Sequence, residues 1–159
     1  GCFHNENMKY LGIDYGDERI GLAISDHEER MAFALATLSR KTLPSKEAFY
    51  AALLNIIEEH NAEGVVVGLP LPLTRHPDVS QEPLTCRKAR NFAASLARRC
   101  PVPIYLVNEA LSSSEAESRL QEAGFKGQKL KEKLDAEAAA VILQQFLNLP
   151  QEKRTRYEP

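Results

Sequence analysis

The first forty residues contain three short apolar runs that predict β-strands. Residues 10–14 and 20–25 are two such runs, and the polar segment Gly-Asp-Glu-Arg at 16–19 between them predicts a tight hairpin. Residues 32–38 form a third run of mainly small and aliphatic side chains. The chain is therefore expected to begin with a hairpin followed by a third strand.

Helix and strand patterns alternate after this point. Pro44 and Ser45 open a segment with apolar residues at helical spacing, and its predicted buried positions are Phe49, Ala52, Leu53, Ile56, Ile57 and His60. The β-branched run at 64–68 predicts a buried strand, and a proline-rich loop is expected to continue to residue 81. A second helix is predicted by the stripe Ala89, Phe92, Ala93, Leu96, Ala97 and Cys100.

The last third of the chain predicts one more strand and two more helices. The strand covers residues 104–107, a helix ends near Gly124, a lysine-rich loop covers 126–133, and an apolar helix covers 134–149. The order β-β-β-α-β-α-β-α-α predicts a mixed α/β sheet covered on both faces. We expect one domain over residues 8–149, with 1–7 as an N-terminal extension or expression remnant and 150–159 as a C-terminal tail.

The charge distribution is more informative than the net charge. The 159 residues carry a formal charge of −2, which excludes a uniformly basic nucleic-acid binder. Residues 1–31 are acidic overall, residues 87–99 hold five basic side chains and no acid, and residues 126–133 hold four lysines against Glu132. A charged run is typical of a solvated face, but two separate basic runs also suit a local anion-binding surface.

The composition also indicates in which cellular compartment the protein is expected. No apolar run approaches the ~20 residues that cross a bilayer, and no signal-peptide pattern is present. Cys2, Cys86 and Cys100 are odd in number and unpatterned in spacing, which argues against a disulfide framework or a zinc cluster. We therefore expect a cytoplasmic protein without a membrane partner.

Three carboxylates lie where predicted elements begin or end. Asp14 closes the first strand ahead of Gly16, Glu109 follows the strand at 104–107, and Asp135 is expected at the start of the last helix. Each also has a purely structural explanation: Asp14 as a turn residue, Glu109 as a surface charge and Asp135 as a charge at a helix N-terminus. If the three converge, however, their repulsion calls for a cation, and Mg²⁺ or Mn²⁺ prefers such oxygen ligands.

Five ordered segments resemble the YqgF/RuvX family, which is described as Holliday junction resolvases. They are residues 11–26 with Asp14-Tyr15-Gly16, 66–71 with Gly68-Leu69-Pro70, 82–93, 108–117 and 133–143. The resemblance implies a ribonuclease H-like fold with a five-stranded mixed sheet and helices on both faces. It also implies a metal-dependent nuclease whose essential carboxylates fall on Asp14, Glu109 and Asp135.

The same resemblance links the chain to nucleic-acid substrates. The family is connected with maturation of the 5′ end of pre-16S rRNA and, by fold analogy, with four-way DNA junctions. One or two Mg²⁺ or Mn²⁺ ions are implied, held by the three carboxylates, in a monomer or homodimer. On this hypothesis the phosphate contacts are Arg87, Arg90, Lys126, Lys129, Lys131 and Lys133.

Two departures from the family pattern keep another function open. Asn108-Glu109-Ala110 stands where the family commonly has Asp-Glu-Arg, and the loop at 72–80 lacks the usual glycine. These changes remove a charge and a guanidinium, which allows a non-catalytic nucleic-acid-binding or assembly protein on a degenerate nuclease fold. A third hypothesis is an actin- or hexokinase-like ATPase, suggested by Asp14-x-Gly16 with Gly21, although such proteins generally need two domains.

Overall fold

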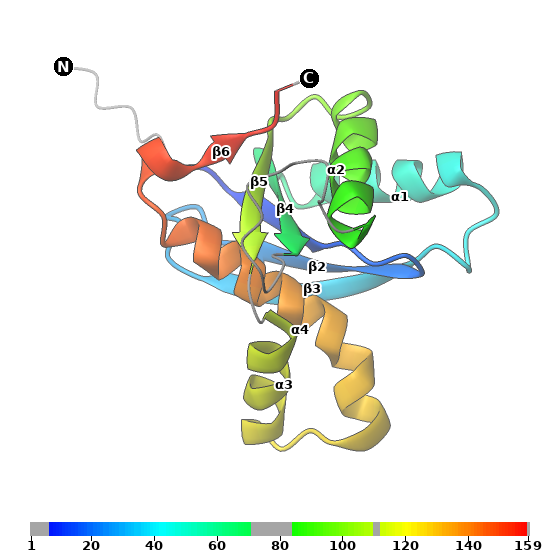
Figure 1. Cartoon of the computed structure of the whole chain (residues 1–159), viewed down its shortest axis with the longest axis vertical. Coiled ribbons are helices and arrows are strands. Elements are labelled where there is room, and N and C mark those ends of the chain that lie inside the picture. The colour runs from blue at the N-terminus through cyan, green and yellow to red at the C-terminus, as the bar shows by residue number, and fades with distance from the viewer. Residues whose placement is uncertain (1–6, 71–83, 110–111, 159) are drawn as a thin grey trace.

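A mixed β-sheet forms the centre of the molecule (Figure 1). The computed structural model describes residues 7–70, 84–109 and 112–158, with Glu109 described by its backbone alone. The long strands, in the sheet order β3-β2-β1-β4-β5, are β3 (Ala32–Ser39), β2 (Arg19–Ser25), β1 (Tyr10–Asp14), β4 (Gly64–Pro70) and β5 (Ile104–Glu109). The first three strands pair antiparallel, whereas β1, β4 and β5 are parallel, as the predicted mixed sheet requires.

A short sixth strand extends the predicted five-stranded sheet. β6 (Thr155–Arg156) follows the 3₁₀ helix η2 (Gln151–Lys153) and pairs antiparallel with Tyr105 and Leu106 of β5. The Tyr157 N–H also donates to the Ile104 carbonyl at 2.7 Å. Two exposed residues have no hydrophobic pattern, so only these tertiary hydrogen bonds identify the strand.

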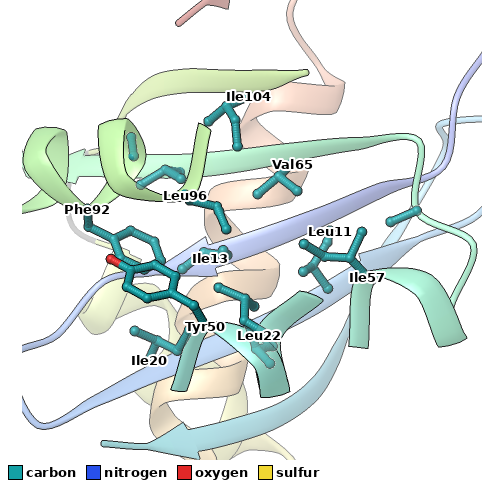
Figure 2. Packing of buried hydrophobic residues seen from close by; sticks show 14 of the residues in the cluster. Leu11, Ile13, Ile20, Leu22, Tyr50, Ile57, Val65, Phe92, Leu96 and Ile104 are labelled. Atoms are coloured by element: carbon teal, nitrogen blue, oxygen red, sulfur yellow. The ribbon is translucent and has the colours of Figure 1, made fainter. Parts of the chain in front are cut away.

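Helices α1 (Lys46–Glu59) and α2 (Leu84–Ala97) cover one face of the sheet. The Ser45 side chain caps α1 by accepting from the Ala48 N–H at 3.1 Å. The core beneath the two helices is formed by side chains from the strands and both helices, as Figure 2 shows; its labelled members are Leu11, Ile13, Ile20, Leu22, Tyr50, Ile57, Val65, Phe92, Leu96 and Ile104.

Helix α4 (Gly127–Leu147) crosses the opposite face, and α3 (Ser112–Glu122) packs against it. In Figure 1, α3 and the first half of α4 project beyond the sheet as a helical hairpin. Two glycines allow α4 to approach the strands closely. A Cβ on Gly12 would lie 2.7 Å from the Leu143 Cβ, and a Cβ on Gly21 would lie 1.8 Å from the Asp135 carbonyl oxygen.

The predicted boundary between a lysine-rich loop and the last helix is wrong. α4 begins at Gly127 and ends at Leu147, so it includes most of the segment expected as a loop over 126–133. Five of the residues 128–133 are polar, but all six are good helix formers, and the sixth, Leu130, supplies a buried apolar contact. The segment is therefore polar because this part of α4 is exposed, and not because it is a loop.

Helix α2 ends at Ala97, three residues before the end of the predicted helical stripe. Cys100 lies beyond the last helical residue, and the chain turns there as the Arg99 N–H donates to the Leu96 carbonyl at 2.9 Å. Residues 71–81, predicted as a proline-rich loop, lie outside the described residues. Within the part of the chain that is described, no helix is long and apolar enough to cross a membrane.

Candidate functional site

Asp14 ends the central strand and faces α4. Gly12, two residues earlier in β1, lies against Leu143 of this helix. Side chains alternate along a strand, so Asp14 shares the face of Gly12. The residue is half-buried at the edge of the sheet where the parallel strands end.

Gly21 connects Asp14 to Asp135. It pairs with Asp14 across the β1–β2 ladder, and its α-carbon lies against the backbone of Asp135 in α4. Paired residues in an antiparallel ladder have Cα atoms ~4.5–5.5 Å apart. Asp14 and Asp135 are therefore both immediate neighbours of one glycine, although 121 residues separate them in the numbering of the sequence.

The position of Asp135 corrects the sequence prediction. It lies in the third turn of α4, not at the helix start, because the helix begins at Gly127. The helix dipole acts within the terminal turns and so has little effect on this carboxylate. Its position is set instead by the close packing of α4 on Gly21.

Arg19 is a site residue that sequence reasoning missed. Its Nε donates to the Asp135 Oδ2, and the two side chains are 53% and 24% exposed. The hydrogen bond and charge of Asp135 raise the pKa of Arg19 further above its ordinary value. The signal in the sequence was the hairpin itself, because the first residue of β2 must lie at the edge where β1 ends.

The backbone of Glu109 lies at the same sheet edge. Glu109 is the last residue of β5, in register with Pro70 of β4, and both strands run parallel to β1. Its side chain is outside the described part of the structure. Among the side chains that are described, no three His, Cys, Asp or Glu residues form a metal-binding group. The structure thus places Asp14 and the backbone of Asp135 next to the same glycine, and participation of Glu109 stays a prediction.

The basic run on α2 begins beside the same edge. Lys88 Nζ lies 3.3 Å from Asp17 Oδ2, which connects α2 to the turn that follows Asp14. Arg87 and Arg90 are exposed on this part of the helix. Arg90 also lines a cavity of about 350 Å³ with Asn108 of β5. Arg98, by contrast, lies beyond the end of α2 and hydrogen-bonds to Ser95.

The four predicted lysine contacts lie on or next to the projecting half of α4. Lys126 precedes the helix, Lys129, Lys131 and Lys133 are within it, and all four are exposed. Lys133 Nζ lies 4.9 Å from the centre of the Phe125 ring. Lys131 precedes Asp135 by one helical turn and so lies on the same face. These lysines and the α2 arginines extend from helices on opposite faces of the sheet.

A family profile described as RuvX, Holliday junction resolvase, matches residues 8–149. The chain belongs to the RuvX family. This membership favours a nuclease over the ATPase hypothesis, since the match spans the whole predicted domain.

Curated relatives of this RuvX protein cover nearly its full length. A protein of Nitratidesulfovibrio vulgaris strain Miyazaki F is 47% identical over 93% of this chain and 99% of its own. One from Oleidesulfovibrio alaskensis is 46% identical over 95% of this chain and 99% of its own. Both bear the name "Putative pre-16S rRNA nuclease".

Solved structures show the fold. The structure titled "T. thermophilus RuvC in complex with Holliday junction substrate" has a TM-score of 0.54 at 18% identity, covering 94% of this chain and 100% of that one. A second Thermus thermophilus RuvC structure has a TM-score of 0.51 at 17% identity, with the same coverage of both chains. The expected ribonuclease H-like fold is thereby confirmed.

Proposed function

We propose that this RuvX protein is a metal-dependent nuclease that hydrolyses phosphodiester bonds at the edge of the sheet formed by β1 and β2. The observation that carries the proposal is the placement of Asp14 and Asp135 on either side of Gly21. Two carboxylates brought together by separate elements repel each other unless a positive group lies beside them. Arg19 is such a group, and it holds one of the two.

The residues present fit a hard divalent cation. Asp14 and Asp135 offer carboxylate oxygens, which Mg²⁺ and Mn²⁺ prefer, and Glu109 ends a neighbouring parallel strand. Asp14 and Asp135 would hold one ion, with Glu109 shared between ions or holding a second. When bound, such ions activate water and neutralise charge on the phosphodiester.

Arg19 places a positive charge beside the candidate carboxylates. Its guanidinium contacts Asp135 and offsets part of the repulsion between the two aspartates. The pair is exposed enough for the arginine to swing away, because an exposed ion pair is worth only ~0–1 kcal/mol. A released guanidinium beside the carboxylates is suited to bind a phosphate oxygen through two parallel hydrogen bonds.

The basic residues of α2 and α4 orient the substrate. Arg87 and Arg90 lie on one side of the carboxylate edge, and the lysines from Lys126 to Lys133 lie on the other. Phosphate contacts of this kind fix the position of a duplex without reading its sequence. This arrangement suits a structured or branched nucleic acid, which presents phosphates on more than one side.

The names of the relatives support pre-16S rRNA as the substrate, and the family description supports branched DNA. We favour the RNA precursor, acted on in the cytoplasm by a monomer or homodimer.

The test is cleavage of two substrates, a pre-16S rRNA 5′ segment and a four-way DNA junction, with Mg²⁺ or Mn²⁺. Asp14→Asn and Asp135→Asn should each lower cleavage more than about 100-fold, since even groups that only support metal ligands contribute 10–100-fold. The matched control is Asp17→Asn, which changes an exposed carboxylate in the adjoining turn.

The outcomes separate the remaining hypotheses. Cleavage that depends on Asp14 and Asp135 but not on Asp17 supports the nuclease. Salt-dependent binding without cleavage of either substrate would instead support the non-catalytic nucleic-acid-binding protein. Activity that survives Asp14→Asn unchanged would remove that residue from the site.

A further inference from the structure

Arg40 is enclosed by aromatic rings next to the hairpin that carries Asp14. It follows β3 directly, and its N–H donates to the Glu18 carbonyl at 2.9 Å. Its guanidinium carbon lies 5.0 Å from the centre of the Tyr15 ring, 4.8 Å from that of Phe49 and 5.9 Å from that of Phe92. These rings hold the guanidinium in one place and favour its positive charge.

The guanidinium of Arg40 has an unmet hydrogen-bonding capacity. Its Nε is buried and has no hydrogen-bond partner, and no carboxylate among the described residues pairs with this arginine. Aromatic faces stabilise a cation but do not replace a hydrogen-bond acceptor for its five N–H groups. A buried donor without an acceptor is costly, which makes it a signal for a missing partner.

A cavity of about 240 Å³ opens beside this arginine. Its lining consists of Arg40, Ser45, Lys46, Phe49 and Tyr50. Lys46 is exposed and, like Arg40, has no ion-pair partner among the described residues. The cavity therefore has two uncompensated cations and an apolar aromatic wall.

Two acids next to the cavity residues, Glu18 and Glu47, already have basic partners. Glu18 is engaged by Lys41 at 3.0 Å, which lowers the pKa of that carboxyl below its ordinary value. Glu47 is engaged by Arg99 at 3.2 Å. Both acids already have basic partners of their own, so the charge of Arg40 and Lys46 remains available to an anion.

We propose that this cavity binds a phosphate group of a nucleic-acid backbone. The Arg40 guanidinium supplies planar N–H donors, Lys46 adds a mobile ammonium, and the Ser45 hydroxyl can donate its proton while its oxygen caps α1. Free inorganic phosphate shares this chemistry and is the alternative source of the anion. The proposal rests on the proposed function only in requiring that the chain bind nucleic acid.

The location of the cavity suggests the path of the strand. Arg40 lies at the edge of the sheet where β1 ends and β2 begins, but on the α1 face, whereas Asp14 faces α4. A strand whose scissile phosphate lies at Asp14 would cross this edge to place another phosphate at Arg40. The cavity would thus fix the direction in which the substrate enters the site.

The test measures binding without cleavage. Affinity for the four-way DNA junction and the structured RNA is determined in EDTA over a series of salt concentrations, for the full chain and for Arg40→Gln and Lys46→Gln. Each variant should weaken binding about fivefold to tenfold at low salt and reduce the salt slope by about one. Lys46 is exposed at the helix start, so Lys46→Gln keeps the test valid even if Arg40→Gln unfolds.

The control is Lys9→Gln, which removes the same charge directly before β1 and outside the cavity lining. It should change affinity less than about twofold. An equal loss with Lys9→Gln, or no loss with Lys46→Gln, would overturn the site. A second arm compares melting temperatures in inorganic phosphate and chloride at matched ionic strength. Stabilisation by phosphate together with unchanged nucleic-acid binding would mark a free-anion site and overturn the backbone assignment.

The same experiment separates this inference from the nuclease proposal. If Lys46→Gln weakens binding but no cleavage occurs with Mg²⁺ or Mn²⁺, the nuclease fails and the phosphate site stands. If cleavage requires Asp14 but Lys46→Gln binds the nucleic acid as tightly as the wild type does, the nuclease proposal stands and the phosphate site fails. Absence of any nucleic-acid binding would overturn both.

Discussion

Two arginine–carboxylate pairs connect the β-hairpins to the region of α4, one at each edge of the sheet, and they differ in burial. Arg19 and Asp135 meet where β1 ends, with side chains 53% and 24% exposed. Arg154 and Glu29 meet at the opposite edge at 2.5 Å, with side chains only 6% and 5% exposed.

The buried pair also makes more hydrogen bonds to its surroundings than the exposed pair does. Arg154 also donates to the carbonyls of Leu147 at 3.1 Å and Leu149 at 3.2 Å, while Glu29 accepts from the Met8 N–H at 2.8 Å. These contacts hold Glu29 at a φ of 59°, a conformation uncommon outside glycine. Among the described residues, Arg19 has one hydrogen-bonded carboxylate partner, Asp135. The buried pair is suited to hold the chain ends together, and the exposed pair is suited to exchange partners.

The largest expected effect comes from breaking the buried pair. Arg154→Met should lower the free energy of unfolding by about 3–5 kcal/mol, because it leaves the Glu29 carboxylate buried without a countercharge. Urea denaturation measures the change. Arg30→Met is the control, since its partner Glu28 and Arg30 itself are 60% and 77% exposed, and a loss comparable to that of Arg154→Met would contradict the distinction by burial.

A methyl group at Gly21 should damage the exposed edge. Its Cβ would lie 1.8 Å from the Asp135 carbonyl oxygen, so α4 must move away from β2. We expect a loss of about 1–3 kcal/mol in unfolding free energy, together with a loss of cleavage greater than a purely thermal effect explains. Urea denaturation and cleavage well below the melting temperature provide the two readouts. Wild-type cleavage in Gly21→Ala would contradict the role of this contact in placing Asp135.

Tyr10, which lies beside Arg154 of the buried pair, predicts a pH dependence of stability. Burial, with a further contribution from Glu29, raises the pKa of Tyr10 from 10.0 to about 12. The neutral phenol is therefore favoured in the folded state, and the corresponding stability is complete below pH 10 and is lost as pH rises towards 12. Urea midpoints should fall over this range in the wild type and fall less in Tyr10→Phe. Parallel curves for the two proteins would contradict the assignment.

The smallest stability effect is expected at the exposed pair. Arg19→Gln should change the free energy of unfolding by less than about 1 kcal/mol. It should nevertheless increase the rise in melting temperature caused by Mn²⁺, because Asp135 no longer has a competing partner. Lys41→Gln, which removes the exposed partner of Glu18, should leave the Mn²⁺ response unchanged. A smaller Mn²⁺ response in Arg19→Gln would show that the arginine supports the cation instead of competing with it.

The sequence predicted the elements whose side chains are buried in regular patterns. The run Val65, Val66 and Val67 is fully buried in β4, and Asp14 ends β1 as expected. The start of α4 was missed because its first turns project from the sheet and expose most of their side chains. A helix with few buried positions has little hydrophobic periodicity to detect.

The sequence predicted where Asp14 lies but not the contact between Arg19 and Asp135. Asp14 ends β1 as expected because strand ends are visible in the sequence, whereas Arg19 meets Asp135 across 116 residues. The Arg154–Glu29 contact spans 125 residues and involves a tail without an apolar pattern. Contacts of this kind depend on the register of the hairpins and on how α4 crosses them, and only the folded chain specifies both.

Helix α4 is also a mechanical element. It is unbroken by proline or glycine after Gly127 and spans 21 residues, or about 30 Å. Asp135 lies about 12 Å along it from the projecting end, and Leu147 lies at the edge fixed by Arg154. A continuous helix transmits a displacement of one end along its length. If the lysines of the free end bind a substrate as proposed, binding there also affects the position of the Asp135 carboxylate.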